Sequence, residues 1–146
     1  MTAQTIIAEV DVDMGRLLTE AHLASYLGLC PDNQITGGKV FRRGTRHIQN
    51  RAATALHMAA TTLLRSNTYL GAKFRRLRTR PGAPKAITAM AHMLARLVYR
   101  MLKYGEQYVD KGMKHYEEKY RAHEIRSMQK KAKDLGLEIT LNLATA

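Results

Sequence analysis

The chain has 146 residues, 45% of them hydrophobic and 25% charged, which predicts one folded domain and excludes a disordered protein. Its single cysteine, Cys30, excludes an internal disulfide and favours a reducing compartment. The formal net charge is +12, and residues 33–105 hold fifteen lysines and arginines but no aspartate or glutamate, so an acidic surface is excluded there.

The first thirty residues show apolar positions at helical spacing. The segment TAQTIIAEV predicts a short helix that ends near Asp11. Thr19 can cap a second helix, EAHLASYLGL, because its hydroxyl can accept a hydrogen bond from a backbone N–H of the first turn. Glu20 is favourably placed in that turn, where the positive end of the helix dipole lies.

Residues 30–45 contain one proline and three glycines and predict a long basic loop. Thr36 stands directly before two adjacent glycines, and four cations follow: Lys39, Arg42, Arg43 and Arg46. Glycines let backbone amides approach a phosphate, cations stabilise charge that develops on it, and a hydroxyl can attack phosphorus. The alternative is a Thr-Gly turn that only reverses the chain.

Two helices are predicted after this loop. Apolar residues follow helical spacing from Arg46 to about Arg65, and Ser66 or Asn67 can cap the next helix. That second helix must end before RPGAP, because proline and glycine interrupt it. Its arginines would extend the basic surface: Arg75, Arg76, Arg78 and Arg80.

The segment Pro84–Tyr104 predicts the longest helix, with Gly105 as its C-terminal cap. One broad apolar stripe would face the core: Ile87, Met90, Ala91, Leu94, Leu97, Val98 and Met101. A charged, exposed helix follows, and LEITLNL at 137–143 predicts a brief strand. The fold expected is therefore a mainly α-helical domain over residues 1–110 with a charged helical tail over 111–146.

No familiar catalytic or metal-binding pattern accompanies the basic loop. The six histidines lack the zinc spacing of two histidines one turn apart around a glutamate. The glycine pair is not followed by the lysine and helix spacing of a nucleotide-binding loop, and a Ser-His-Asp hydrolase is unsupported. We therefore expect no metal ligands in this chain.

The positive charge of residues 33–105 predicts the class of partner that this chain binds. A field of one sign repels itself and is tolerated most easily when a polyanion neutralises it, so nucleic acid is expected. The alternative is a basic surface kept for solubility. Residues 1–10 lack the features of a signal peptide, and the most apolar span, 52–64, is too short to cross a bilayer. We expect a cytoplasmic, nucleoid-associated protein that does not bind membranes.

Much of the chain resembles the C-terminal part of the insertion sequence one-ten family of transposases. The resemblance covers roughly residues 1–110 and is carried, in the family's order and spacing, by TAQTIIAEV, HLASYLGLCPDN, TGGK, NRAATAL and LGAKFRRLRTRPGAPKAITAMAHMLARLVYRML. It implies DNA recombination guided by a structured RNA. It also implies that the opening helix is the remnant of a helix-hairpin-helix element.

The resemblance places Thr36 where the family has its serine nucleophile. Threonine keeps the hydroxyl but adds a methyl group that crowds attack at phosphorus. In the family, divalent metal such as magnesium is held by four acids of an N-terminal RNase-H-like domain, which has no counterpart in these residues. We therefore expect a truncated transposase that depends on that missing domain, or on a homo-oligomer, and does not cut DNA alone.

Two functions stay open. The first is the DNA-binding, strand-transfer part of a transposase, with Thr36 as nucleophile and the basic residues on the phosphates. The second is a non-catalytic module that binds nucleic acid or oligomerises. Strand cleavage after complementation with an acidic domain would favour the first, and binding alone would favour the second.

Overall fold

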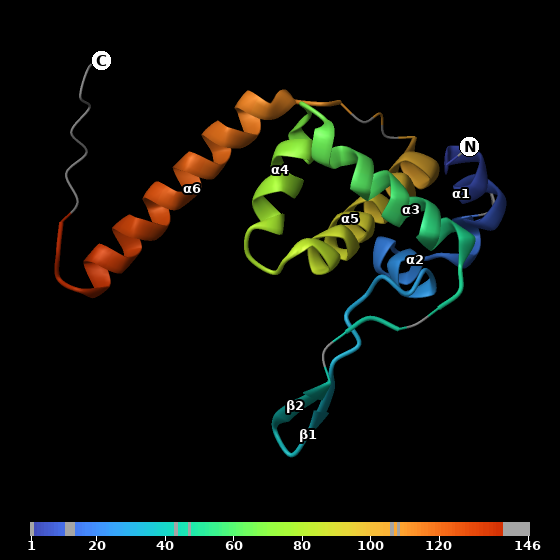
Figure 1. The fold of residues 1–146 in the computed structure, drawn as a ribbon, viewed down its shortest axis with the longest axis horizontal. Coiled ribbons are helices and arrows are strands. Elements are labelled where there is room, and N and C mark those ends of the chain that lie inside the picture. The colour runs from blue at the N-terminus through green and yellow to red at the C-terminus, as the bar shows by residue number, and fades with distance from the viewer. Residues whose placement is uncertain are drawn as a thin grey trace.

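The computed structural model describes residues 2–10, 14–42, 44–46, 48–105, 107 and 109–138. Within these residues the chain forms six α-helices and one two-stranded sheet, which confirms a mainly α fold (Figure 1). In chain order the elements are α1 (Thr2–Val10), a 3₁₀ turn (Met14–Arg16), α2 (Glu20–Tyr26), β1 (Gln34–Thr36), β2 (Lys39–Arg42), α3 (Arg51–Thr62), a 3₁₀ turn (Leu63–Arg65), α4 (Tyr69–Arg78), α5 (Ala83–Tyr104) and α6 (Gly112–Asp134).

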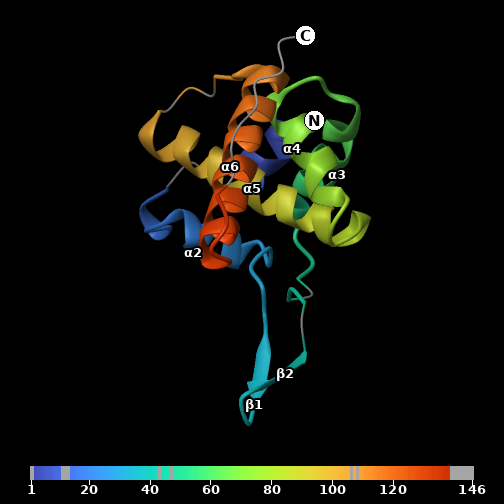
Figure 2. The ribbon, with the colours of Figure 1, turned by 90° about the vertical axis from the view of Figure 1, so that its left-hand side faces the viewer.

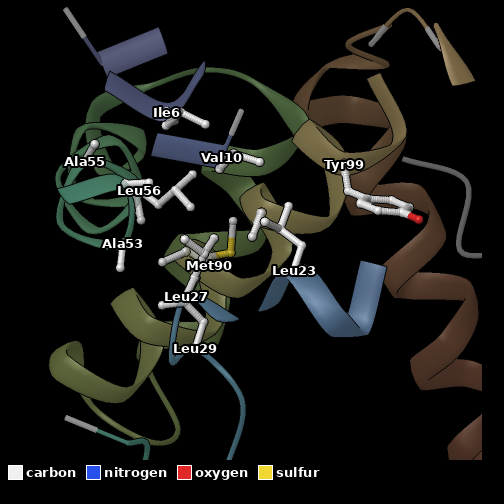
Figure 3. Close-up of a cluster of buried hydrophobic side chains, with 14 of the residues drawn as sticks. Ile6, Val10, Leu23, Leu27, Leu29, Ala53, Ala55, Leu56, Met90 and Tyr99 are labelled. Carbon is white, nitrogen blue, oxygen red and sulfur yellow. The ribbon is translucent and has the colours of Figure 1, made fainter. Parts of the chain in front are cut away.

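The hydrophobic core is built around α5, which packs against α2, α3 and α4, while α1 covers α3 (Figure 3). Leu23, Leu56, Phe74 and Met90 are almost fully buried there. The helices α3 and α5 pack against each other, and each buries several alanines. The buried alanines of these two helices are Ala52, Ala53, Ala55, Ala60, Ala86, Ala91 and Ala95.

The predicted stripe of α5 is confirmed in part. Met90 and Ala91 are buried, and four more of its residues, Ile87, Leu94, Leu97 and Val98, pack against the core while partly exposed. Met101 is 46% exposed, so its placement in the stripe is wrong. Tyr99 takes a buried position instead, because residues spaced by four from Ala91 through Ala95 to Tyr99 lie on one helical face.

Several predicted helix ends agree with the structure. The hydroxyl of Thr19 accepts a hydrogen bond from the backbone N–H of His22, at 3.3 Å, and begins α2 as expected. The segment α1 ends at Val10, close to the predicted limit. Gly105 ends α5 with a left-handed φ of 63°, the conformation that favours glycine after a helix.

Two predicted helix starts are wrong. The helix α3 begins at Arg51 and not at Arg46, because Oδ1 of Asn50 accepts hydrogen bonds from the N–H groups of Ala52 (2.8 Å) and Ala53 (3.2 Å). The helix α4 is capped by Thr68, whose hydroxyl accepts from the N–H of Gly71 at 3.1 Å. Ser66 supports this cap from outside the helix, with its Oγ 2.6 Å from Oγ1 of Thr68.

The segment predicted as a long loop, residues 30–45, contains the hairpin of β1 and β2. Its two strands are short and exposed along their whole length. Because neither face is buried, the sequence shows no alternation of apolar and polar residues. The pair Gly37–Gly38 has φ values of 58° and 75°, as the central residues of a two-residue hairpin turn require. The turn is therefore specified by the glycines and not by the strands.

The charged helix α6 is confirmed as largely exposed. It packs against α4, and Figure 1 shows its far end apart from the other helices. No helix within the described ranges combines the length and apolarity needed to span a membrane. The strand predicted at 137–143 falls mostly on residues 139–146, which lie outside the described residues, as do Arg43 and His47.

A glycine in the first turn of α4 yields a stability prediction. A Cβ on Gly71 would overlap the carbonyl oxygen of Ser66 and lie 2.9 Å from that of Leu63. Gly71→Ala should therefore lower the free energy of unfolding by about 1–3 kcal/mol, although glycine to alanine usually stabilises a helix by about 1 kcal/mol. Urea denaturation would measure the change. Gly44→Ala is the control, since nothing lies within 4 Å of its Cβ, and an unchanged midpoint for Gly71→Ala would contradict the prediction.

Candidate nucleic-acid interface

The hairpin projects from the helical body, as the two perpendicular views show (Figures 1 and 2). Its strands are antiparallel, with Thr36 opposite Lys39 and Ile35 opposite Val40. All seven strand residues are exposed. A partner can therefore reach both faces and the tip of this ribbon.

The tip brings together the predicted nucleophile and a cation. Directly opposed residues of an antiparallel pair have Cβ atoms about 5 Å apart and point to the same face. Thr36 and Lys39 are such a pair, on either side of the Gly37–Gly38 turn. A phosphate placed at this tip can therefore contact the Lys39 ammonium while its phosphorus lies near the Thr36 hydroxyl.

The base of the hairpin is held by backbone contacts. The N–H of Asp32 donates to the carbonyl of Gly44 at 2.7 Å, and Pro31 pairs with Thr45. Nε of Arg46 lies 3.9 Å from Oδ1 of Asp32, and both side chains are well exposed. Arg46 therefore sits at the base, partly neutralised, while Lys39 marks the tip.

The α4 arginines are not equivalent. Nη1 of Arg75 donates to the carbonyls of Ser66 (2.7 Å) and Leu64 (3.3 Å), and Nη2 lies 3.1 Å from Sδ of Met113. This side chain ties the last turn of α4 to the segment before the helix and to α6. Contact of Arg75 with nucleic acid stays a prediction.

Arg76 and Arg80 both engage a tyrosine of α6. The guanidinium of Arg76 lies 3.3 Å from the centre of the Tyr120 ring, and Nη2 of Arg80 lies 3.4 Å from the Tyr120 hydroxyl. Both arginines are exposed, as is Arg78 on the last turn of α4. Three of the four predicted arginines are thus accessible, two in the last turn of α4 and one just beyond its end.

A basic cleft that the sequence did not predict lies between α4 and α5. Its volume is about 410 Å³, and four basic side chains line it together with one carboxylate: Lys73, His92, Arg96, Arg100 and Glu20. Arg96 and Arg100 both form ion pairs with Glu20 (3.0 Å from Arg100). Arg96 and Arg100 are one turn apart in the sequence, which predicts a shared face, but their approach to Lys73 depends on how α4 packs.

Two side chains of this cleft have lowered pKa values. Burial lowers the pKa of the Lys73 ammonium, and the nearby charges of Lys119 and Arg96 lower it further. Burial also lowers the pKa of His92, with Arg96 adding to the effect. Both shifts come first from burial, which disfavours the charged form, and the neighbouring cations add to it. For His92 the carboxylate of Glu20 acts in the opposite direction.

A second cleft connects this basic surface to the hairpin. It has a volume of about 560 Å³ and lies between the hairpin base, at Pro31 and Thr45, and the start of α5, at Lys85 and Thr88. His92 lines both clefts. The hairpin base and the basic cleft are therefore neighbouring parts of one surface.

Among the residues that the structure describes, no three or more histidine, cysteine, aspartate or glutamate side chains come close enough to hold a metal ion. The divalent metal that the transposase resemblance implies would be held by the acids of another domain, and that stays a prediction.

Comparison with known proteins gives one match. The family model described as transposase IS116/IS110/IS902 family matches residues 1–76. No curated protein and no solved structure matches the chain. The matched segment extends from α1 into α4 and includes the whole hairpin.

Proposed function

Because this chain belongs to the IS116/IS110/IS902 family of transposases, we propose that it is the DNA-binding part of a transposase. The observation that carries the proposal is the projecting hairpin, which places Thr36 and Lys39 together at an exposed tip. A two-stranded ribbon can enter the major or the minor groove of duplex DNA. DNA is the proposed partner, at the nucleoid in the cytoplasm, with a structured guide RNA as a second nucleic acid.

The basic residues would hold the phosphate backbone. Lys39 and Arg42 lie on the hairpin, and Arg46 lies at its base. Arg76, Arg78 and Arg80 offer a second basic surface at the end of α4. Contacts of this kind fix the position of a protein on DNA but do not read its sequence. Arg43 and Arg75 belong to the same proposed set.

The proposed reaction is attack by Oγ1 of Thr36 on a DNA phosphorus. A bond forms between Oγ1 and phosphorus, and the bond from phosphorus to a sugar oxygen breaks. The proton lost by Thr36 balances the proton gained by the departing sugar hydroxyl, so nothing is oxidised or reduced. Lys39 would stabilise the charge on the phosphate oxygens. The metal-binding acids would come from another segment or chain, either an N-terminal acidic domain or a partner in a homo-oligomer.

The second candidate is a module that binds nucleic acid without cutting it. It is favoured by the methyl group of Thr36, which crowds the hydroxyl. In both cases we propose residues 1–110 as the transposase-like unit and 111–146 as its charged tail.

The proposal predicts strongly salt-dependent binding to duplex DNA. If about six to eight basic residues meet phosphates, the log of the affinity should fall against the log of the salt concentration with a slope near −5 to −7. Fluorescence anisotropy of a labelled duplex measures this slope. A slope near zero would remove the case for a polyanion partner.

Two matched double variants test whether the hairpin is the surface that contacts DNA. Lys39→Ala with Arg42→Ala should make the slope about 2 units shallower, since each lost phosphate contact removes about 0.9. Lys130→Ala with Lys131→Ala removes the same charge from the far part of α6 and should change the slope less. Equal effects of the two pairs would mean that the hairpin is not the contact surface.

A further inference from the structure

The hairpin exposes three large apolar side chains in addition to its cations. Ile35 is 64% exposed, Val40 41% and Phe41 83%, the last being the highest value among the large hydrophobic residues that the structure describes. Phenylalanine is among the side chains most often buried in proteins. An aromatic ring held this far into solvent indicates a partner that covers it.

An irregularity in the sheet explains why Phe41 stands out. Val40 pairs with Ile35, and Arg42 pairs with Gln34, so Phe41 is the extra residue of β2 with no residue opposite. Such a β-bulge breaks the alternation of the strand and redirects a side chain. Phe41 therefore has no directly opposed residue on β1 to cover its ring.

The charges around Phe41 favour nucleic acid over a second copy of the hairpin as the partner. Lys39 lies two residues before it and Arg42 directly after it. The nearest carboxylate in the sequence is Asp32, which lies at the base beside Arg46. A second copy of the hairpin would bring like charges together, whereas nucleic acid offers phosphates for the cations and bases for the ring. Proteins that bind the minor groove of DNA use cations in this way and frequently insert an apolar side chain between base steps.

We propose that Phe41 is a base-stacking wedge. The hairpin enters a groove of the DNA, Lys39 and Arg42 hold phosphates on either side, and the Phe41 ring inserts against a base. This inference rests on the proposed function, since it requires the hairpin to contact DNA. Unstacking at that step would make the neighbouring phosphate more accessible to the tip where Thr36 lies.

The chain offers a clean optical test because it contains no tryptophan. Phe41→Trp introduces a single indole at the bulge, and stacking of that indole on a base quenches its fluorescence. Met58→Trp is the matched control, because Met58 is 66% exposed on α3 and outside the hairpin. We expect saturating duplex DNA to quench the Phe41→Trp emission strongly and to leave the Met58→Trp emission nearly unchanged.

Binding measurements on Phe41→Ala complete the test. Loss of one stacked ring should weaken binding by about 5- to 150-fold, while the salt slope stays the same because no charge is removed. If anisotropy shows binding but Phe41→Trp is not quenched, the wedge is overturned and the DNA-binding proposal stands. If no duplex binds at all, both fail. If the Phe41→Trp emission changes with protein concentration alone, a second copy covers the ring and the wedge is again overturned.

Discussion

Thr36→Ala should abolish the covalent attachment of this protein to DNA while leaving its affinity for DNA unchanged. The hydroxyl is the atom that would form the bond to phosphorus, and alanine removes it without altering charge. Loss of an enzyme nucleophile lowers the rate on the order of 10⁴-fold or more. Thr36 is exposed at the hairpin tip, so the fold should survive the change.

The assay supplies a family acidic domain, guide RNA and magnesium and looks for a protein–DNA adduct on a denaturing gel. Thr36→Ser should react faster than the natural chain, because serine lacks the methyl group beside the hydroxyl. The chain alone should leave DNA uncut at any magnesium concentration. Thr45→Ala, at the exposed base of the hairpin, is the control and should still form adduct. An adduct with Thr36→Ala would place the nucleophile elsewhere.

Tyr99→Ala should cause the largest loss of stability among single changes in α5. Tyr99 is 1% exposed, and its hydroxyl lies 2.9 Å and 2.7 Å from the carbonyls of Leu17 and Leu18. Nζ of Lys103 donates to the same two carbonyls, at 3.1 Å and 2.9 Å. Removing the ring leaves a cavity where α5 meets the segment before α2. The expected cost is about 3–5 kcal/mol, a large part of the stability of a small domain.

Urea denaturation separates the ring from its hydroxyl. Tyr99→Phe should cost only about 1 kcal/mol, because it removes one hydrogen bond and keeps the packing. Tyr26→Ala removes a tyrosine that is 52% exposed on α2 and should change the midpoint little. If Tyr99→Ala and Tyr26→Ala unfold at the same urea concentration, the ring does not support the core as described.

The sequence predicted α5 well in extent but less well in orientation. Proline, glycine and the apolar spacing define where a helix begins and ends, and these signals are local. Whether Met101 or Tyr99 faces inward depends on the exact rotation of the helix against its neighbours. Tyrosine is also ambiguous in sequence, since it has an apolar ring and a polar hydroxyl. The carbonyls of Leu17 and Leu18, far away in the chain, accept hydrogen bonds from its hydroxyl and so allow the residue to be buried.

The sequence predicted which residues lie beside the glycine turn, but it did not predict the hairpin that carries them. Thr36 and Lys39 were recognised as neighbours of a glycine turn, yet strands that bury no face leave no periodic signal to identify them. The bulge at Phe41 depends on a register between two strands, which composition does not specify. The basic cleft was missed because Lys73 and Arg96 lie on different helices that meet only through tertiary packing.

The buried alanines of α3 and α5 limit how this protein can change over evolutionary time. Because Ala52 and Ala95 are completely buried and carry the smallest side chain above glycine, they have little volume to lose. A larger residue at either position would have to push its surroundings apart, and close-packed interiors resist that. Substitution at these two buried positions is therefore restricted to residues no larger than alanine. Enlargement is selected against, while the exposed hairpin can vary in sequence without disturbing the body that carries it.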